Sequence, residues 1–267
     1  MHRPNQIRTL LTIAGSDCSG GAGIQADIKT ADAFKVYAAS AITAVTVQNA
    51  MGVKSVNPVC PQIVLDQIDA VYESFTPDAV KIGMLPSADI VRMVSQKLTS
   101  LNAVNIVVDP VLLSTTGQSL SGNTNESIRA LRDFLFPIAS VVTPNYDEAR
   151  KILGIHENLE PAELCKLFHK STGAAAVLLK GGHIYGPYCT DILYNGNQFH
   201  RYRQVRIDSR NTHGTGCVLS SAIASGLARG LILPQAVRIA KNFISHAIDM
   251  AKDIHLTPDN GPLYLFP

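Results

Sequence analysis

Short runs of apolar residues alternate along the chain with longer segments whose apolar residues recur at helical spacing. Short runs that end at a glycine, a proline or a polar residue are typical of strands buried on both faces. The predicted strands cover residues 10–14, 40–48, 79–82, 105–108, 140–143 and 174–179. The predicted helices cover residues 22–34, 88–101, 125–136, 216–229 and 234–252, with another that starts at Pro61 and a short one after Asn145. This alternation predicts an α/β fold, a three-layer α/β/α doubly wound sheet that is mainly parallel.

One later stretch departs from this alternation. Residues 189–194 and 198–205 flank Asn195 and Gly196, a pair typical of a type I′ hairpin turn. We therefore expect an antiparallel extension at the edge of the sheet. Residues 114–125 are polar and contain glycine, which is typical of a mobile loop. Because the composition does not shift along the chain, residues 1–267 are predicted to form a single domain.

Composition excludes several classes of protein. The chain has 267 residues, of which 46% are hydrophobic and 16% charged, so it can bury a large core and is not a disordered chain. A net charge of +2, scattered basic residues and only 6% aromatics argue against nucleic acid or an anionic membrane as partner. Five cysteines without a C-x-x-C pair indicate neither a zinc site nor a disulfide framework, so we expect a cytoplasmic protein. The apolar run near the start is too short for a signal peptide, and no run approaches the length of a membrane span.

Residues 211–217, NTHGTGC, directly precede a predicted helix. The first amides of a helix lack internal acceptors and lie at the positive end of its dipole. Gly214 and Gly216 allow close approach to these amides, so we predict an anion hole that stabilises a phosphoryl group in transfer. At the helix start, Cys217 is predicted to have a lowered pKa and to be able to take a proton from a substrate hydroxyl. A thiol that only packs against other side chains is the alternative.

A glycine-rich turn, GSDCSGGAG, follows the first predicted strand. A hydroxyl, a carboxylate and four glycines in one turn favour a small polar ligand, although the glycines alone would also suit a tight turn. Residues 21–26 match the loose dinucleotide pattern G-x-G-x-x-A. However, the second strand ends at Gln48 and Asn49, without the acid that a dinucleotide ribose requires. The P-loop pattern is absent as well, which disfavours both of these nucleotide-binding classes.

Charged residues follow three more strands of the predicted sheet. Asp109 ends one strand, and Asn145 and Glu148 follow another, a combination of oxygen ligands that suits Mg²⁺. For each acid a purely structural role is as good an interpretation as metal binding. Asp109 would then be a turn residue, and Glu148 would complement the dipole at a helix start. Lys180 ends a further strand before two glycines, where it can reach a nucleotide phosphate, and His183 after them needs no catalytic role. Ligands of open α/β sheets bind at the carboxyl ends of the strands. Because all of these motifs follow strand ends, together they are stronger evidence for a ligand site than any one motif alone.

The motifs together resemble the hydroxymethylpyrimidine/phosphomethylpyrimidine kinases of thiamine biosynthesis, within the ribokinase-like superfamily. The resemblance covers nearly the whole chain. It is carried by residues 14–30 (AGSDCSGGAGIQADIKT), 41–49 (AITAVTVQN), 81–85 (KIGML), 107–111 (VVDPV), 143–149 (TPNYDEA), 179–183 (LKGGH) and 211–217 (NTHGTGC). It implies a ribokinase-like fold and ATP-dependent phosphorylation of 4-amino-5-hydroxymethyl-2-methylpyrimidine, and then of its monophosphate to the diphosphate.

The resemblance also implies roles for individual residues. The pyrimidine pocket would be lined by Gly15, Ala22, Gln48, Met84, Val111 and Cys217. Mg²⁺ would be held by Asp109 and Glu148. The ATP phosphates would be bound by Asn145, Lys180, Thr212 and the backbone of Gly214, Thr215, Gly216 and Cys217. A homodimer is expected on the same ground. Many ribokinase-like enzymes carry an aspartate base where this chain has Cys217, so the resemblance leaves open whether Cys217 abstracts the proton.

Pyridoxal kinase is the alternative function, because it shares the architecture and a related substrate shape. Some similar vitamin B6 kinases carry methionine in place of Gln48 and the variant THGAGC, so Gln48 and Thr215 favour the pyrimidine. The chain departs from similar proteins at Thr115, where they usually have a lysine on a loop near the phosphates. That departure puts the loop's phosphate contacts and the second phosphorylation in question. A binding protein without turnover is disfavoured, since a pure binder needs no transition-state stabilisation.

Overall fold

The computed structural model describes residues 7–112, 124–182, 186–257 and 260–265. In these residues nine strands form one sheet in the order β3-β2-β1-β4-β5-β6-β7-β8-β9. The strands are β1 (Arg8–Asp17), β2 (Val36–Asn49), β3 (Gly52–Pro58), β4 (Ala79–Ile82), β5 (Ile106–Val108), β6 (Val141–Val142), β7 (Val177–Leu179), β8 (Tyr188–Tyr194) and β9 (Phe199–Val205). The six strands from β2 to β7 in the sheet order pair in parallel, and β3, β8 and β9 add antiparallel edges.

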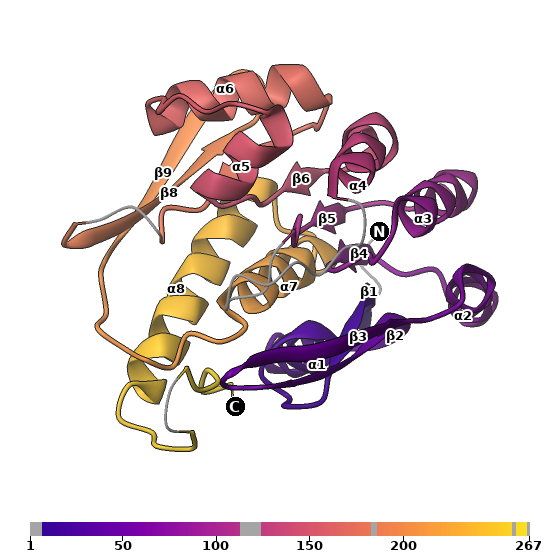
Figure 1. The fold of residues 1–267 in the computed structure, drawn as a ribbon, viewed down its shortest axis with the longest axis horizontal. Coiled ribbons are helices and arrows are strands. Elements are labelled where there is room, and N and C mark those ends of the chain that lie inside the picture. The colour runs from indigo at the N-terminus through magenta and orange to yellow at the C-terminus, as the bar shows by residue number, and fades with distance from the viewer. Residues whose placement is uncertain (1–6, 113–123, 183–185, 258–259, 266–267) are drawn as a thin grey trace.

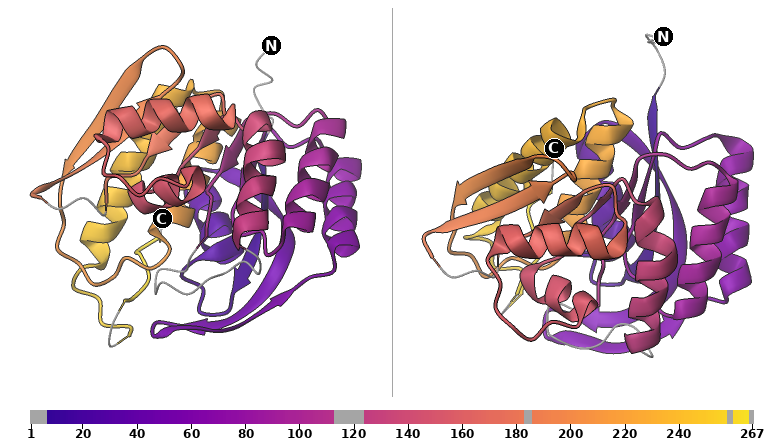
Figure 2. Two further views of the ribbon diagram at one scale, coloured as in Figure 1. Left: turned by 45° about the horizontal axis from the view of Figure 1, so that its top comes forward. Right: turned by 90° about the horizontal axis from the view of Figure 1, so that it is seen from above.

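Helices cover both faces of this sheet (Figures 1 and 2). One face carries α1 (Gly23–Ala33), α7 (Thr215–Ala228) and α8 (Leu233–Ala251). The other carries α2 (Pro61–Ser74), α3 (Ala88–Ser100), α4 (Thr124–Ala130), α5 (Tyr146–Leu153) and α6 (Pro161–Thr172), of which α2, α3 and α4 stand in a row. The predicted three-layer α/β/α architecture with a mainly parallel sheet is therefore confirmed. Among the described residues, no helix is both long and apolar enough to cross a membrane.

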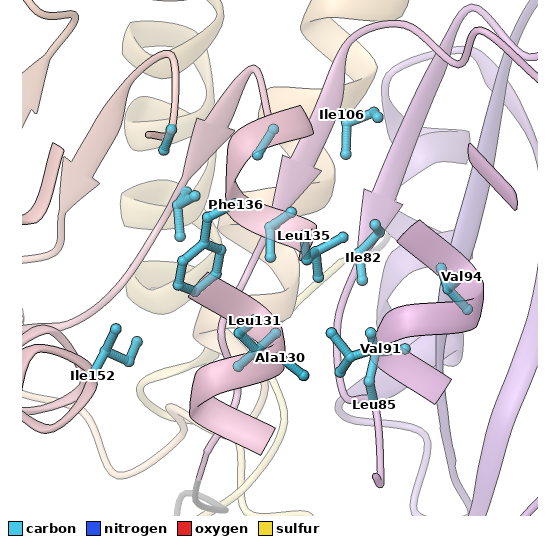
Figure 3. Packing of buried hydrophobic residues seen from close by; sticks show 14 of the residues in the cluster. Ile82, Leu85, Val91, Val94, Ile106, Ala130, Leu131, Leu135, Phe136 and Ile152 are labelled. Carbon is cyan, nitrogen blue, oxygen red and sulfur yellow. The ribbon is translucent and has the colours of Figure 1, made fainter. Parts of the chain in front are cut away.

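The hydrophobic core forms one layer on each face of the sheet, because successive strand residues point to opposite faces. In β1, Leu11 and Ile13 pack under the row of α2, α3 and α4, whereas Leu10 packs under α1 and α7. Figure 3 shows the first layer, where Ile82 of β4 lies between the helical segments that carry Val91 and Leu135. Strands buried on both sides need apolar residues at nearly every position, which is why their runs were visible in the sequence.

The structure corrects the predicted elements in three places. The helix predicted over 125–136 begins as α4 but continues as a π-helical turn, Leu131–Leu135, and a 3₁₀ turn, Phe136–Ile138. Pro137 accounts for the change, because its nitrogen cannot donate to the preceding turn. Strand β3 and helix α6 were not predicted at all.

The predicted edge hairpin is confirmed as β8 and β9, which pair antiparallel from Tyr188–Val205 to Tyr194–Phe199. Thr115, most of the loop predicted over 114–125, and His183 lie outside the described residues. The strands β1, β4, β5, β6 and β7 run in the same direction, so their carboxyl ends meet at one edge of the sheet. The polar motifs follow these ends, and their side chains are therefore brought together.

Candidate functional site

A cavity of about 820 Å³ opens at the carboxyl ends of the parallel strands. Its walls come from the turn after β1, the end of β2, the segments after β4, β5, β6 and β7, and the start of α7. Every site residue predicted from the sequence lies on its wall: Gly15, Ala22, Gln48, Met84, Asp109, Val111, Asn145, Glu148, Lys180, Thr212, Gly214, Thr215, Gly216 and Cys217. The size suits a small-molecule substrate together with part of a nucleotide.

The start of helix α7 borders this cavity through residues 214–217. Gly214 is the N-cap residue and has a left-handed backbone with φ of 85°. A Cβ atom there would lie 1.9 Å from the carbonyl oxygen of Gly21, so the close approach of the two turns requires glycine. At Gly216 a Cβ atom would lie 3.0 Å from Asp109 Oδ2, so the carboxylate reaches the first turn of the helix. The helix start is thus open to the cavity and is not filled by packed side chains.

Three charged side chains meet beside the helix start. Lys180 Nζ lies 2.7 Å from Asp109 Oδ1 and 3.8 Å from Glu148 Oε2. Thr143 Oγ1 also donates to Asp109 Oδ1, at 2.9 Å. Although burial favours the neutral amine, Asp109 and Glu148 hold the pKa of Lys180 above its ordinary value. Burial raises the pKa of Glu148, and Lys180 opposes that shift. The lysine therefore carries its positive charge at the wall of the cavity.

Glu148 and Asn145 also form the capping box of α5. Asn145 Oδ1 accepts from Glu148 N at 2.8 Å, and Glu148 Oε2 accepts from Asn145 N at 2.7 Å. The structural interpretation of Glu148 is thus correct in part, because one carboxylate oxygen caps the helix. The other oxygen, Oε1, and Asp109 Oδ2 have no hydrogen bond or ion pair within the described residues.

These two carboxylates fit a Mg²⁺ ion. The described residues contain no group of three or more histidine, cysteine, aspartate or glutamate side chains that could enclose a metal. Mg²⁺ does not need such a cage, since it usually keeps several waters and takes one or two carboxylates together with substrate phosphates. One oxygen each from Asp109 and Glu148 beside an open cavity meets that requirement.

The glycine turn after β1 forms the part of the wall next to the start of α7. Gly15 faces Met84 so closely that a Cβ atom would lie 2.5 Å from its terminal methyl carbon. Asp17 at the end of β1 accepts hydrogen bonds from the backbone amides of Ser19 and Ala22, at 2.8 Å each, and so closes the turn. Ala22 and Gln48 line the cavity next to this turn. The turn is therefore held by its own carboxylate and leaves the cavity free for a ligand.

A contact that sequence reasoning missed joins this turn to the NTHGTGC segment. His213 Nε2 lies 2.9 Å from Asp17 Oδ2, and a side chain at Gly21 would collide with the His213 ring. Although burial favours the neutral acid, the hydrogen bonds from His213 and Ser19 hold the pKa of Asp17 below its usual range. The two residues are 196 positions apart, so their pairing has no local signal.

The predicted lowering of the Cys217 pKa is wrong. Burial raises the pKa of Cys217 to about 11, although Lys81 and a hydrogen bond from the Gly23 amide oppose that rise. The prediction considered the helix start alone, whereas α7 packs against α1 and β4. The sulfur loses its water there, and the neutral thiol is favoured.

Two buried lysine–aspartate pairs at this cavity had no signal in the sequence. Lys81 Nζ lies 2.8 Å from Asp27 Oδ2, and Lys241 Nζ lies 2.7 Å from Asp191 Oδ2. Lys81, Lys241 and Asp191 line the cavity, and Asp191 also accepts the amide of Gly181 at 2.8 Å. Each lysine lies on a different element from its partner, so only the folded chain brings the charges together.

Comparison with known proteins agrees with this site. Residues 17–264 match the family described as phosphomethylpyrimidine kinase. The chain is 43% identical to a Rhizobium meliloti hydroxymethylpyrimidine/phosphomethylpyrimidine kinase, covering 96% of each protein. It is 44% identical to the chloroplastic thiamine biosynthetic bifunctional enzyme TH1 of Arabidopsis thaliana, over 93% of this chain and 48% of that one. The chain thus spans about half the length of such bifunctional relatives.

The fold agrees with solved structures as well. The ADP complex of Bacillus subtilis pyridoxal kinase is 33% identical, with a TM-score of 0.86 and coverage of 97% of both chains. This similarity confirms the expected ribokinase-like fold. Since the family match extends over most of the sequence and a relative of equal length is 43% identical, the chain belongs to the phosphomethylpyrimidine kinase family.

Proposed function

We propose that the chain phosphorylates 4-amino-5-hydroxymethyl-2-methylpyrimidine with ATP and then phosphorylates the resulting monophosphate. Family membership supports a kinase, and the names of its full-length relatives support this pyrimidine. The observation that carries the proposal is the convergence of two sets of residues on one cavity. The glycine turn and Gln48 line the cavity beside the start of α7 and Lys180. An acceptor alcohol and a phosphate donor can therefore meet there.

On the donor side, the first amides of α7, from Gly214 to Cys217, would bind the terminal phosphate of ATP. Lys180 would approach the same phosphate as a positive charge, and Asn145 and Thr212 would position the phosphate chain. ADP and an ATP analogue are bound in pyridoxal kinases of similar structure, which supports ATP as donor. Asp109 and Glu148 would hold Mg²⁺, which supplies charge neutralisation between the phosphates when bound.

On the acceptor side, Gln48 can both donate and accept hydrogen bonds at the edge of an aminopyrimidine. Gly15, Ala22, Met84 and Val111 would enclose the ring. The hydroxymethyl group would then point toward the start of α7. Its proton would pass to the Cys217 thiolate, forming an S–H bond, while the oxygen electron pair attacks the terminal phosphorus and ADP leaves. Because the neutral thiol is favoured at rest, this step requires groups that stabilise the thiolate.

The test is a product-resolved assay with purified protein and Mg·ATP on three acceptors in parallel: the hydroxymethylpyrimidine, its monophosphate and pyridoxal. We expect the monophosphate and then the diphosphate of the pyrimidine, each with one equivalent of ADP. An Asp109→Asn variant controls for a contaminating kinase, since its activity should fall sharply. Absence of pyrimidine phosphorylation by well-folded protein would refute the proposal.

Pyridoxal phosphorylation is the second candidate activity. It is favoured by one observation, the TM-score of 0.86 to Bacillus subtilis pyridoxal kinase at 33% identity. The comparison of kcat/KM for the two alcohols decides between them. Three further expectations stay predictions: one ribokinase-like domain over residues 1–267, a cytoplasmic location and a homodimer. Size-exclusion chromatography with light scattering would test the dimer.

A further inference from the structure

Lys81 is a charged residue in the interior of an otherwise apolar strand. It belongs to β4, Ala79–Ile82, and neither its side chain nor that of its partner Asp27 is exposed to solvent. Burying an ion pair costs desolvation energy, and well-packed apolar residues in its place are often equally stable or more so. Folding stability therefore does not account for a lysine at this position, and a use for its charge is the better explanation.

The pair lies one helical turn below Cys217. Cys217 and Ser221 are four residues apart on α7, and Gly23 and Asp27 are four residues apart on α1, so each couple shares one helix face. At the upper level the backbone of Gly23 lies near the sulfur of Cys217 and favours its thiolate. At the lower level Ser221 Oγ donates to Asp27 Oδ1 at 2.6 Å. The two helices thus place the Lys81–Asp27 pair directly behind the thiol.

Asp27 is fixed in this place by three partners. Besides Lys81 and Ser221, Thr12 Oγ1 donates to Asp27 Oδ2 at 2.6 Å. Lys81 Nζ, by contrast, makes one hydrogen bond within the described residues, to Asp27, and lines the cavity. The absence of a side chain at Gly83 makes room for the ammonium group, because a Cβ atom there would lie 2.8 Å from Nζ. The positive charge is therefore held in place in the interior, in a residue that borders the cavity.

We propose that Lys81 is a positioning residue for Cys217, whose ammonium group, fixed by Asp27, is the counter-charge that allows the sulfur to ionise in its buried place. The inference rests on the proposed function, in which the thiolate takes the proton of the substrate hydroxyl. Four charged groups act on the sulfur: Lys81 and Lys180 favour the thiolate, and Asp27 and Asp109 oppose it. Among the causes that lower the pKa of Cys217, Lys81 is the largest.

The test measures ionisation of the thiol directly. Ligand-free protein is treated with iodoacetamide between pH 7 and pH 10, and alkylation of the peptide that contains Cys217 is followed by mass spectrometry. Since the thiolate is the reacting form, Lys81→Met should slow alkylation of Cys217 about tenfold at pH 9 for each unit of pKa rise. Lys81→Arg, which keeps the charge, should restore most of the rate.

The second buried pair provides a matched control. Lys241 pairs with Asp191 on another wall of the same cavity, and its Nζ lies 3.4 Å from Cys189 Sγ. Lys241→Met should leave the alkylation profile of Cys217 unchanged. In the same digest, Lys81→Met should leave the profile of Cys189 unchanged. A general loosening of the protein would instead alter both cysteines in both variants.

Equal alkylation of Cys217 in wild type and Lys81→Met would overturn the inference. If Lys81→Met does not fold, the double variant Lys81→Met with Asp27→Asn is compared with Asp27→Asn alone, because these two proteins differ only in the lysine. Slower alkylation of Cys217 in the double variant than in Asp27→Asn supports the inference, and an equal rate overturns it. The assay needs neither nucleotide nor acceptor. Failure of the wild type to phosphorylate the pyrimidine would therefore count against the proposed function, while the alkylation rates still decide the role of Lys81.

Discussion

Replacing Gly214 by alanine should disable the site through the backbone. The left-handed conformation at φ of 85° costs an L-residue about 1 to 2 kcal/mol. In addition, the new Cβ atom would lie 1.9 Å from the carbonyl oxygen of Gly21, well inside van der Waals contact. That oxygen belongs to the backbone of a turn and cannot rotate away as a side chain would. Relieving the overlap by moving the turn should cost about 1 to 3 kcal/mol more, as for other overpacked sites.

The displaced turn should also weaken catalysis. The first amides of α7 would no longer point at the phosphate, and loss of one such donor typically lowers kcat about 10²- to 10³-fold. Gly154 offers a matched control, because it has φ of 69° but a Cβ atom added there would meet no other atom within 4 Å. Gly154→Ala should therefore show the dihedral cost alone. Urea unfolding and kcat for pyrimidine phosphorylation would be measured on both variants. Equal stability and equal kcat in the two would refute this reasoning.

Three further outcomes follow from the site. Asp109→Asn should lower kcat at least about 100-fold, because the variant lacks a proposed Mg²⁺ ligand. Substrate-dependent ADP release from folded protein checks this, and unchanged turnover would remove the metal role. Because the pKa of Cys217 is raised to about 11, kcat/KM of the wild type should rise between pH 7 and pH 9.5. A flat profile in the wild type that is the same in Cys217→Ser would exclude the cysteine as base. The pKa of Asp17 is lowered in the folded protein, so its contribution to stability is complete above the unfolded value near pH 4 and is lost as the pH falls below it. Asp17→Asn should accordingly flatten the acid side of a stability curve from urea titrations, and parallel curves would contradict the pairing with His213.

The sequence predicted the fold well where burial is two-sided. The strand predicted over 105–108 contains β5, Ile106–Val108, because a strand covered on both faces is apolar at successive positions. Strand β3 was missed because all of its residues are partly or fully exposed and its run contains Lys54, Ser55 and Asn57. Helix α6 had a readable signal, because its buried residues Leu164, Cys165, Phe168 and Thr172 follow helical spacing.

The site was predictable as far as it depends on strand ends. The end of each parallel strand places its next residues at one edge, so Asp109, Asn145 and Lys180 could be grouped without coordinates. The raised pKa of Cys217 could not be predicted, because it depends on the water that the packing of α1 against α7 excludes. The Lys81–Asp27 pair joins residues 54 positions apart on a strand and a helix, and no local pattern reports such a contact.

The contact between Gly21 and Gly214 has a consequence for how this architecture diversifies. The turn proposed to receive the alcohol and the loop proposed to hold the phosphoryl group are in close backbone contact and are tied by Asp17 and His213. Because neither segment can change shape without disturbing the other, we expect substitutions in both to be poorly tolerated. New acceptor molecules would instead be accommodated at parts of the cavity wall away from that junction, such as Val111.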